Sequence, residues 1–216
     1  RENYLFGMQA IDADHVVWKA DLLEGKVDLS VARVLGGYLA TIHRETADNE
    51  ELRQRFADTQ VFDQLRLDPF YRRISQAHAG IAAPIAALIS ETTDTKACLV
   101  LGDFSPKNIL ITGDGLTLVD FETGHYGDPA FDLGFFLSHL LLKTVLHNQR
   151  APDFLELAGT FWSTYCSGIL SGQIDCTAFN ESELERRSIA NLAGCMLARI
   201  DGKSTVDYLS DKEQQD

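Results

Sequence analysis

The stretch of sequence that decides the fold reads LGDFSPKNIL over residues 101–110 and LTLVDFETGHYGDPAFDLG over residues 116–134. Two short apolar runs within it, 109–112 and 116–119, have the length and composition of β-strands. Between them stands Gly113-Asp114-Gly115, whose two glycines allow the positive φ angles of a tight turn. The sequence therefore predicts a β-hairpin at this point of the chain.

Polar side chains stand at the open end of the predicted hairpin. If the hairpin is symmetric about Asp114, Asn108 lies directly opposite Asp120, with the two side chains roughly 5 Å apart. An amide oxygen and a carboxylate so placed suit Mg²⁺, which keeps part of its water shell and shares itself with phosphate oxygens. Glu122 would point the same way in an extended chain and is a candidate ligand for a second ion. Asp103, in the loop before Asn108, is placed to accept a proton from an attacking hydroxyl.

The composition of the 216 residues is that of an ordinary globular chain, 45% hydrophobic and 24% charged. With 32 acidic and 19 basic residues the net charge is −13, which argues against binding to nucleic-acid backbones. The four cysteines contain no CxxC pair, which indicates thiols in a reducing compartment, and so the cytoplasm, rather than zinc ligands or disulfides. The most apolar stretch, 130–147, contains Asp132 and Lys143, so we expect a core helix and no membrane span.

Outside the hairpin the pattern is mainly helical, with apolar residues recurring every three to four positions. Helices are expected over residues 31–42, with Asp28 or Ser30 as N-cap, and from Phe131 onward, with Asp128 as N-cap and Pro129 as the first helical residue. Residues 70–92 are expected to be mostly helical, with Pro84 ending or kinking the helix. Two more helices are expected over residues 153–165 and 182–200, the last of them stopped by Gly202. A buried strand is expected over residues 97–101. The predicted fold class is α+β, mainly α: one helical domain around a small strand-rich insert.

The central stretch resembles the catalytic segment of the aminoglycoside phosphotransferase and choline kinase-like enzymes, which are relatives of the protein kinases. The HGDxxxxN motif of that family appears here as Leu101-Gly102-Asp103 with Asn108, and the metal motif appears as Asp120-Phe121-Glu122. A late stretch, Ala198 to Ser204 followed by Tyr208-Leu209, is similar to a C-terminal motif of many members. The resemblance implies the C-terminal lobe of a protein kinase-like phosphotransferase with a central catalytic β-hairpin.

The resemblance also implies a role for each polar residue of this segment. These roles are Asp103 as catalytic base, Asn108 and Asp120 as Mg²⁺ ligands, Glu122 as an assisting ligand for a second ion, Lys107 as a phosphate contact, and Asp132 as a buried helix acid that accepts hydrogen bonds from the backbone of the catalytic loop. A solvated lysine is the simpler interpretation of Lys107.

Residues 1–10 correspond, in this resemblance, to the last strand of the N-terminal lobe and the hinge, and residues 11–216 to the helical C-terminal lobe with the catalytic loop and metal site. Tyr4–Met8 would be that strand, while Gln9 and Ala10 would meet the adenine of ATP. The family's phosphate-covering loop, its strand lysine and the glutamate that pairs with it have no counterpart in the sequence. Apolar surface exposed around Tyr4–Met8 would favour self-association.

The function expected first is ATP- and Mg²⁺-dependent transfer of a γ-phosphoryl group to the hydroxyl of a small molecule. An acidic lining of the acceptor site would favour an amine-bearing acceptor. One alternative is a catalytically silent kinase-like module that binds a ligand or a partner, which is favoured by Leu101 in place of the family's histidine and by the missing lobe. A third hypothesis is a two-metal hydrolase that uses the same acids. The intact set of Asp103, Asn108 and Asp120 favours the phosphotransferase.

Overall fold

The structure, a computed structural model, describes residues 10–11, 13–113, 115–172, 177–203 and 205–209. The strand predicted over Tyr4–Met8 and the predicted hinge residue Gln9 lie outside the described residues. Ala10 is described, and it is exposed and precedes the first regular element.

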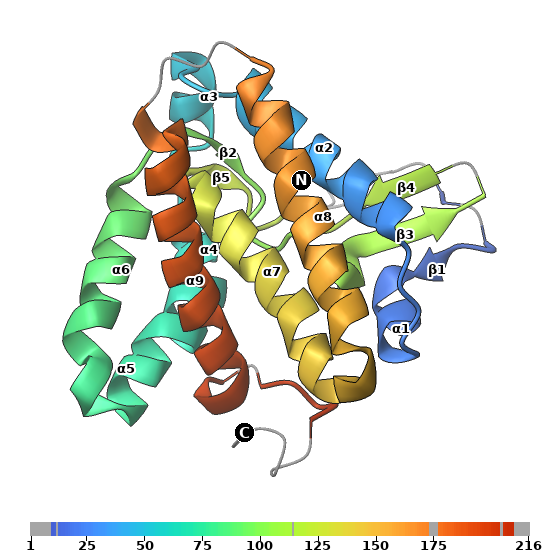
Figure 1. The fold of residues 1–216 in the computed structure, drawn as a ribbon. Coiled ribbons are helices and arrows are strands. Elements are labelled where there is room, and N and C mark those ends of the chain that lie inside the picture. The colour runs from blue at the N-terminus through green and yellow to red at the C-terminus, as the bar shows by residue number, and fades with distance from the viewer. Residues whose placement is uncertain (1–9, 12, 114, 173–176, 204, 210–216) are drawn as a thin grey trace, which may run out of the picture.

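Long helices form the body of the domain. They are α2 (Leu29–Glu45), α7 (Pro129–Leu146), α8 (Ala151–Leu170) and α9 (Glu181–Asp201). Figure 1 shows α7 in the middle of the molecule, with α9 packed on one side and α8 on the other, and α2 packs along α8. The domain is mainly helical with small antiparallel sheets, which confirms the predicted α+β class.

The ends of these helices follow the local signals in the sequence. Asp128 caps α7, because its side chain accepts a hydrogen bond of 3.0 Å from the backbone N–H of Ala130, and Pro129 is the first helical residue. Asp28 caps α2 in the same way through the N–H of Ser30, at 2.8 Å. The helix α9 stops at Gly202, as predicted, whereas α8 extends beyond the predicted residues 153–165 at both ends.

Residues 70–92 are mostly helical, as predicted, but the break falls at residue 78 and not at Pro84, and the segment between α2 and the first buried strand is divided into short pieces. These are α3 (Glu50–Arg55), α4 (Gln60–Phe62), the π-helix η1 (Asp63–Arg72), α5 (Arg73–Ala77), the 3₁₀ turn η2 (Ala79–Ile81) and α6 (Ala82–Asp94). Pro84 lies in the first turn of α6, where a missing N–H costs no intrahelical hydrogen bond, so it neither ends nor kinks the helix.

Two small antiparallel sheets accompany the helices. The first has the order β1 (Val16–Val17), β3 (Ile109–Thr112) and β4 (Gly115–Leu118), and the second pairs β2 (Cys98–Val100) with β5 (His125–Gly127). In Figure 1 β1, β3 and β4 lie on the far side of the molecule from α6, whereas β5 contacts α6 and β2 contacts α7. The remaining short elements are α1 (Trp18–Leu23) and the 3₁₀ turns η3 (Pro106–Asn108), η4 (Asn148–Arg150) and η5 (Thr177–Phe179).

The predicted hairpin exists, but its register differs from the prediction by one residue. Ile109 pairs with Leu118 and Thr112 pairs with Gly115, so the hairpin is not symmetric about residue 114. Two residues therefore connect the strands, which is the commonest length for a hairpin because such turns match the twist of the strands. In consequence Asn108 lies opposite Val119, whose N–H donates to the Asn108 carbonyl at 3.0 Å, and not opposite Asp120.

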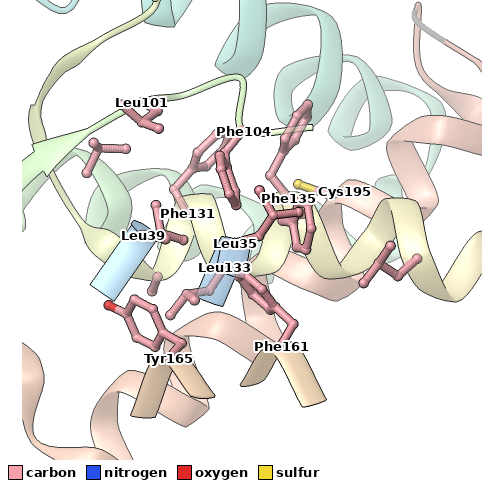
Figure 2. Packing of buried hydrophobic residues seen from close by; sticks show 14 of the residues in the cluster. Leu35, Leu39, Leu101, Phe104, Phe131, Leu133, Phe135, Phe161, Tyr165 and Cys195 are labelled. Carbon is pink, nitrogen blue, oxygen red and sulfur yellow. The ribbon is translucent and has the colours of Figure 1, made fainter. Parts of the chain in front are cut away.

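The hydrophobic core joins the helices to the loop that follows β2. Figure 2 shows Phe104 of this loop beside Phe131 and Phe135 of α7 and Phe161 of α8. The Phe104 ring lies 4.8 Å from the ring of Phe136 and is buried. Burial of an aromatic side chain of this size contributes about 1.5–3 kcal/mol, so Phe104 anchors the loop in the core.

The helix α7 is the one helix among the described residues that is long and apolar enough to cross a membrane, and 72% of it is buried inside the protein. It therefore forms the core helix that the sequence predicted. Cys98 and Cys195 are buried and Cys166 is half-buried, and none of these three cysteines takes part in a disulfide.

Candidate active site

The loop between β2 and β3 is fixed to α7 by a single carboxylate. Asp132, fully buried on α7, accepts hydrogen bonds from the backbone N–H groups of Leu101 at 2.7 Å and Gly102 at 2.8 Å. Hydrogen bonds to a charged group contribute about 1.5–3 kcal/mol each, so this pair strongly constrains the start of the loop. The structure thus places Asp132 where the family resemblance puts the acid that holds the catalytic loop.

A histidine from a distant helix supports Asp132. His43 of α2 is fully buried, with Nε2 at 3.3 Å from the Asp132 carboxylate and Nδ1 at 2.9 Å from the hydroxyl of Tyr165. If Nε2 donates to the carboxylate, Nδ1 accepts from the tyrosine, so one tautomer satisfies both partners. Sequence reasoning missed His43, although a histidine beside Leu39 and Ala40 on the apolar face of a helix signals a buried polar contact.

Gly102 has a backbone conformation that only glycine adopts easily. Its φ is +71°, and a Cβ at this position would lie 2.8 Å from the carbonyl oxygen of Thr123. The Thr123 hydroxyl in turn donates to the carbonyl of Leu101 at 2.8 Å. The loop therefore turns sharply just before Asp103.

Asp103 is almost fully buried and has two cationic partners, one for each carboxylate oxygen. Nη2 of Arg66 lies 2.8 Å from Oδ1, and Nζ of Lys107 lies 2.8 Å from Oδ2. Arg66 also donates from Nε to the carbonyl oxygen of Gly102 at 2.7 Å. The side chain of Asp103 is thus held in one orientation by a basic residue from another part of the chain.

Arg66 was not found from the sequence. It comes from the π-helix η1, in which Leu67, Phe70 and Tyr71 are buried while Arg66 itself is 8% exposed. An arginine surrounded by apolar positions needs a buried acceptor or carboxylate, and this pattern could have identified it. π-Helices of this length are rare, and η1 places Arg66 next to Asp103.

The side chains of Asp103, Asn108 and Asp120 line one pocket, together with Phe104, Ser105 and neighbouring apolar residues. Asn108 donates from Nδ2 to the carbonyl oxygen of Asp103 at 3.0 Å, so its amide oxygen remains an acceptor. Asp120 has a φ of +67°, which is uncommon for a residue other than glycine but is tolerated by aspartate, and its side chain is 40% exposed. The three residues are therefore brought together although the hairpin register differs from the prediction.

The donor set of this pocket fits Mg²⁺. The amide oxygen of Asn108 and the carboxylate of Asp120 are hard oxygen ligands, and no group of three or more His, Cys, Asp or Glu side chains able to hold a metal occurs among the described residues. Mg²⁺ commonly takes one or two protein ligands and completes its shell with water and phosphate oxygens, so a two-ligand site suits it. Glu122 is exposed and does not line the pocket.

Lys107 lies between the two acids. Its Nζ is 2.8 Å from the Asp103 carboxylate and 4.0 Å from that of Asp120, and about half of its side chain is exposed. Lys107 is therefore partly solvated and also paired with Asp103.

The chain belongs to the phosphotransferase enzyme family, because residues 8–163 match that family. This confirms the resemblance stated from the sequence. A methylthioribose kinase of Erwinia tasmaniensis is 25% identical over 230 residues, which cover 91% of this chain and 56% of that protein. A 4-hydroxytryptamine kinase of Psilocybe cyanescens is 27% identical over 145 residues, which cover 59% of this chain and 40% of that protein. The chain spans about half the length of these relatives.

Proposed function

We propose that this chain is the catalytic part of a small-molecule kinase that transfers the γ-phosphoryl group of ATP to a hydroxyl group of its substrate. The observation that carries the proposal is the meeting of Asp103, Asn108 and Asp120 at one pocket, on a loop that Asp132 ties to α7. The names of the relatives, which are kinases of small hydroxyl compounds, support the same class of reaction.

Asp103 accepts the hydrogen bond of the acceptor hydroxyl and takes its proton as the new phosphate ester forms. Its two cationic partners fix its direction. Asn108 and Asp120 would hold Mg²⁺, which when bound would neutralise charge on the transferred phosphoryl group. Lys107 adds a second positive charge on the same side of Asp103, where the donor phosphates would lie.

The division of the chain remains part of this proposal. Residues 11–216 form the helical lobe with the catalytic loop, and residues 1–10, with Gln9 and Ala10, lead to the lobe that binds the adenine. Glu122 is a candidate ligand for a second ion that enters with the nucleotide. Cys98 and Cys195 form no disulfide, which fits an enzyme that works in the cytoplasm.

The hydrogen bonds that hold the loop before Asp103 to α7 disfavour the hypothesis of a catalytically silent module. Leu101 removes the histidine side chain of the family motif, but the loop keeps its tie to α7 through backbone N–H groups and Asp132. No pocket residue needed for transfer has been replaced: Asp103, Asn108 and Asp120 are all present.

The test uses Asp103→Asn in the complete polypeptide, from its natural start codon to its stop codon. We expect ADP formation in the presence of an acceptor to fall by about 10²–10⁴, because a positioned base contributes that much, while Mg²⁺-dependent stabilisation by ATP is retained. Asp153→Asn, which changes an exposed ion pair on α8, serves as the matched control and leaves both measurements unchanged. Equal turnover by Asp103→Asn would refute the role of Asp103, and no nucleotide stabilisation in any variant would favour the silent module.

A further inference from the structure

A groove lies between α8 and α9, with α7 at its floor. Both helices pack against α7 rather than against each other, and Figure 1 shows α7 lying between them. Side chains of all three helices line a hollow of about 180 Å³ at this place. The lining residues are Leu137, Trp162, Glu185, Ser188, Ile189 and Leu192, and we call this hollow the α8–α9 groove.

The apolar surface of the groove continues along α8 toward η5. Trp162 is shared with a second, smaller hollow, whose other lining residues are Cys166, Ile169, Leu170, Phe179, Glu181 and Leu184. At the rims Leu170 is 67% exposed and Ile189 is 57% exposed. Adjoining exposed apolar side chains of this kind mark binding surfaces more often than single ones do.

One polar atom in the lining of the groove has no partner. Ser188 is 1% exposed, and its buried Oγ forms no hydrogen bond within the described part of the chain. Buried hydroxyls are nearly always hydrogen-bonded, so this one indicates a partner that the groove receives from outside. Glu185 lies three residues earlier on α9 and therefore on the same side of the helix.

The groove carries negative charge that no basic side chain neutralises. Glu181 and Glu185 are exposed and form no ion pair among the described residues, whereas Glu183, between them, pairs with Arg186 at 3.0 Å. No described lysine or arginine lines either hollow. Burial, followed by the carboxylates of Glu181 and Glu185, raises the pKa of Cys166 to about 11, which shows that both charges act on the groove.

The α8–α9 groove is separate from the pocket of Asp103, with which it shares no lining residue. Phe136 of α7 and Phe161 of α8 point to the catalytic loop, with ring centres 4.8 Å and 6.2 Å from that of Phe104. Leu137 and Trp162, the next residues along the same helices, line the groove instead.

The size of the groove suits a small organic molecule. An apolar cavity of about 150 Å³ holds one benzene ring, so a hollow of about 180 Å³ has room for a ring and a short arm. Small-molecule sites are mostly apolar, with a few polar groups that fix the orientation of the ligand. Here these polar groups are Ser188 and Glu185.

We propose that the α8–α9 groove binds a small organic amine that has an apolar ring and a short arm ending in an ammonium group. The ring packs against Trp162 and Leu137, while the ammonium group donates to Oγ of Ser188 and faces the carboxylate of Glu185. A second copy of the chain fits less well, because a protein with a net charge of −13 would bring further negative charge to an acidic groove. The inference does not depend on the kinase function.

The experiment compares three probes that share one ring and differ in charge, namely 2-phenylethylamine, 2-phenylethanol and phenylacetate, at pH 7 and equal ionic strength. Binding to the complete polypeptide is followed by the melting temperature and by tryptophan emission. We expect the amine at ten times its Kd to raise Tm by about 3–6 °C. The amine should bind about three- to fivefold more tightly than the alcohol, since an exposed ion pair contributes up to about 1 kcal/mol, and phenylacetate should give no rise.

Two variants test the polar contacts, and neither removes an interaction of the folded chain. Glu185→Gln should make the amine and the alcohol bind equally, and Ser188→Ala should weaken binding of the amine about three- to tenfold, with Tm of the free protein unchanged. The matched control is Glu183→Gln, which changes an exposed acid of the same helix outside the groove and keeps wild-type binding. Trp162→Phe should remove the change in emission and retain the rise in Tm.

The location of the amine is tested against the reaction pocket. Asp120→Asn removes a carboxylate of that pocket and should leave binding of the amine unchanged. Loss of binding in Asp120→Asn places the amine at the reaction pocket and overturns the inference. Equal binding of all three probes, no saturable binding, or binding that survives both Glu185→Gln and Ser188→Ala overturns it as well. A dimer in sedimentation that Ile189→Lys dissociates would assign the groove to a second copy instead.

Discussion

Replacing Arg66 with methionine removes one partner of a buried ion pair. Arg66 and Asp103 are 8% and 5% exposed, and their nearest atoms, Nη2 and Oδ1, are 2.8 Å apart. Breaking such a pair from one side costs about 3–5 kcal/mol, because the remaining charge stays buried. Lys107 still contacts the other oxygen of Asp103, so we expect the lower end, about 3 kcal/mol.

The same helix offers a matched control. Arg72 of η1 forms an ion pair with Asp63 through contacts of 2.6 and 2.8 Å, but both side chains are 40% exposed. Exposed pairs of this kind contribute about 0–1 kcal/mol. Urea unfolding should therefore show a loss of about 3 kcal/mol for Arg66→Met and less than about 1 kcal/mol for Arg72→Met. For a chain of this size the first loss corresponds to a decrease in Tm of about 6–12 °C.

A double-mutant cycle tests whether Arg66 acts through Asp103. In the Asp103→Asn background, Arg66→Met should cost much less than in the wild type, with a coupling of about 1–3 kcal/mol. In the complete polypeptide Arg66→Met should lower kcat with little change in KM for ATP, because Arg66 faces away from the donor side. Equal losses for Arg66→Met and Arg72→Met, or additive effects with Asp103→Asn, would show that Arg66 does not position the carboxylate.

Further predictions concern other residues around the loop. Burial lowers the pKa of Lys143 in the folded state from 10.5 to about 7, so between these pH values the unfolded chain binds more protons than the folded chain. The free energy of unfolding should therefore rise with pH in that window by up to about 1.4 kcal/mol per pH unit. Urea titrations at several pH values should show this rise in the wild type and not in Lys143→Met. Gly102→Ala should lower the free energy of unfolding by more than about 2 kcal/mol, because the added Cβ would meet the Thr123 carbonyl at a residue with positive φ. Gly113→Ala is the control, because an added Cβ there would have no atom within 4 Å. His43→Phe should cost about 2–4 kcal/mol and lower kcat, and a variant with wild-type kcat would show that the His43 contact is structural only.

The parts of the fold that the sequence predicted are those with strong local signals. The caps at Asp28 and Asp128 and the stop at Gly202 depend on neighbouring residues, and all three appear in the structure. The break within residues 70–92 was placed at Pro84 instead of residue 78, and the π-helix was missed, since η1 is held by contacts with α9 that no local periodicity shows. The hairpin register was wrong because two glycines allowed more than one turn, and the strand pairing chose the two-residue connection.

In the candidate site, too, the residues with local sequence signals were predicted and those placed by long-range contacts were not. Asp103, Asn108 and Asp120 lie close together in the sequence, so a motif is enough to find them. Arg66 and His43 stand 36 and 89 residues from the groups that they contact, Gly102 and Asp132. Their chemistry depends on which helices pack against the loop, and that is decided by tertiary structure.

The leucine at the first position of the loop motif changes less chemistry than the sequence alone implied. The N–H of Leu101 is the group that Asp132 binds, and a backbone N–H does not depend on the side chain that accompanies it. The Leu101 side chain is buried in the core, so it adds apolar packing where the family has an imidazole. His43 brings an imidazole to the same carboxylate from α2. Loss of the motif histidine therefore leaves the loop anchored, and the three residues of the proposed transfer chemistry, Asp103, Asn108 and Asp120, are all present at the pocket.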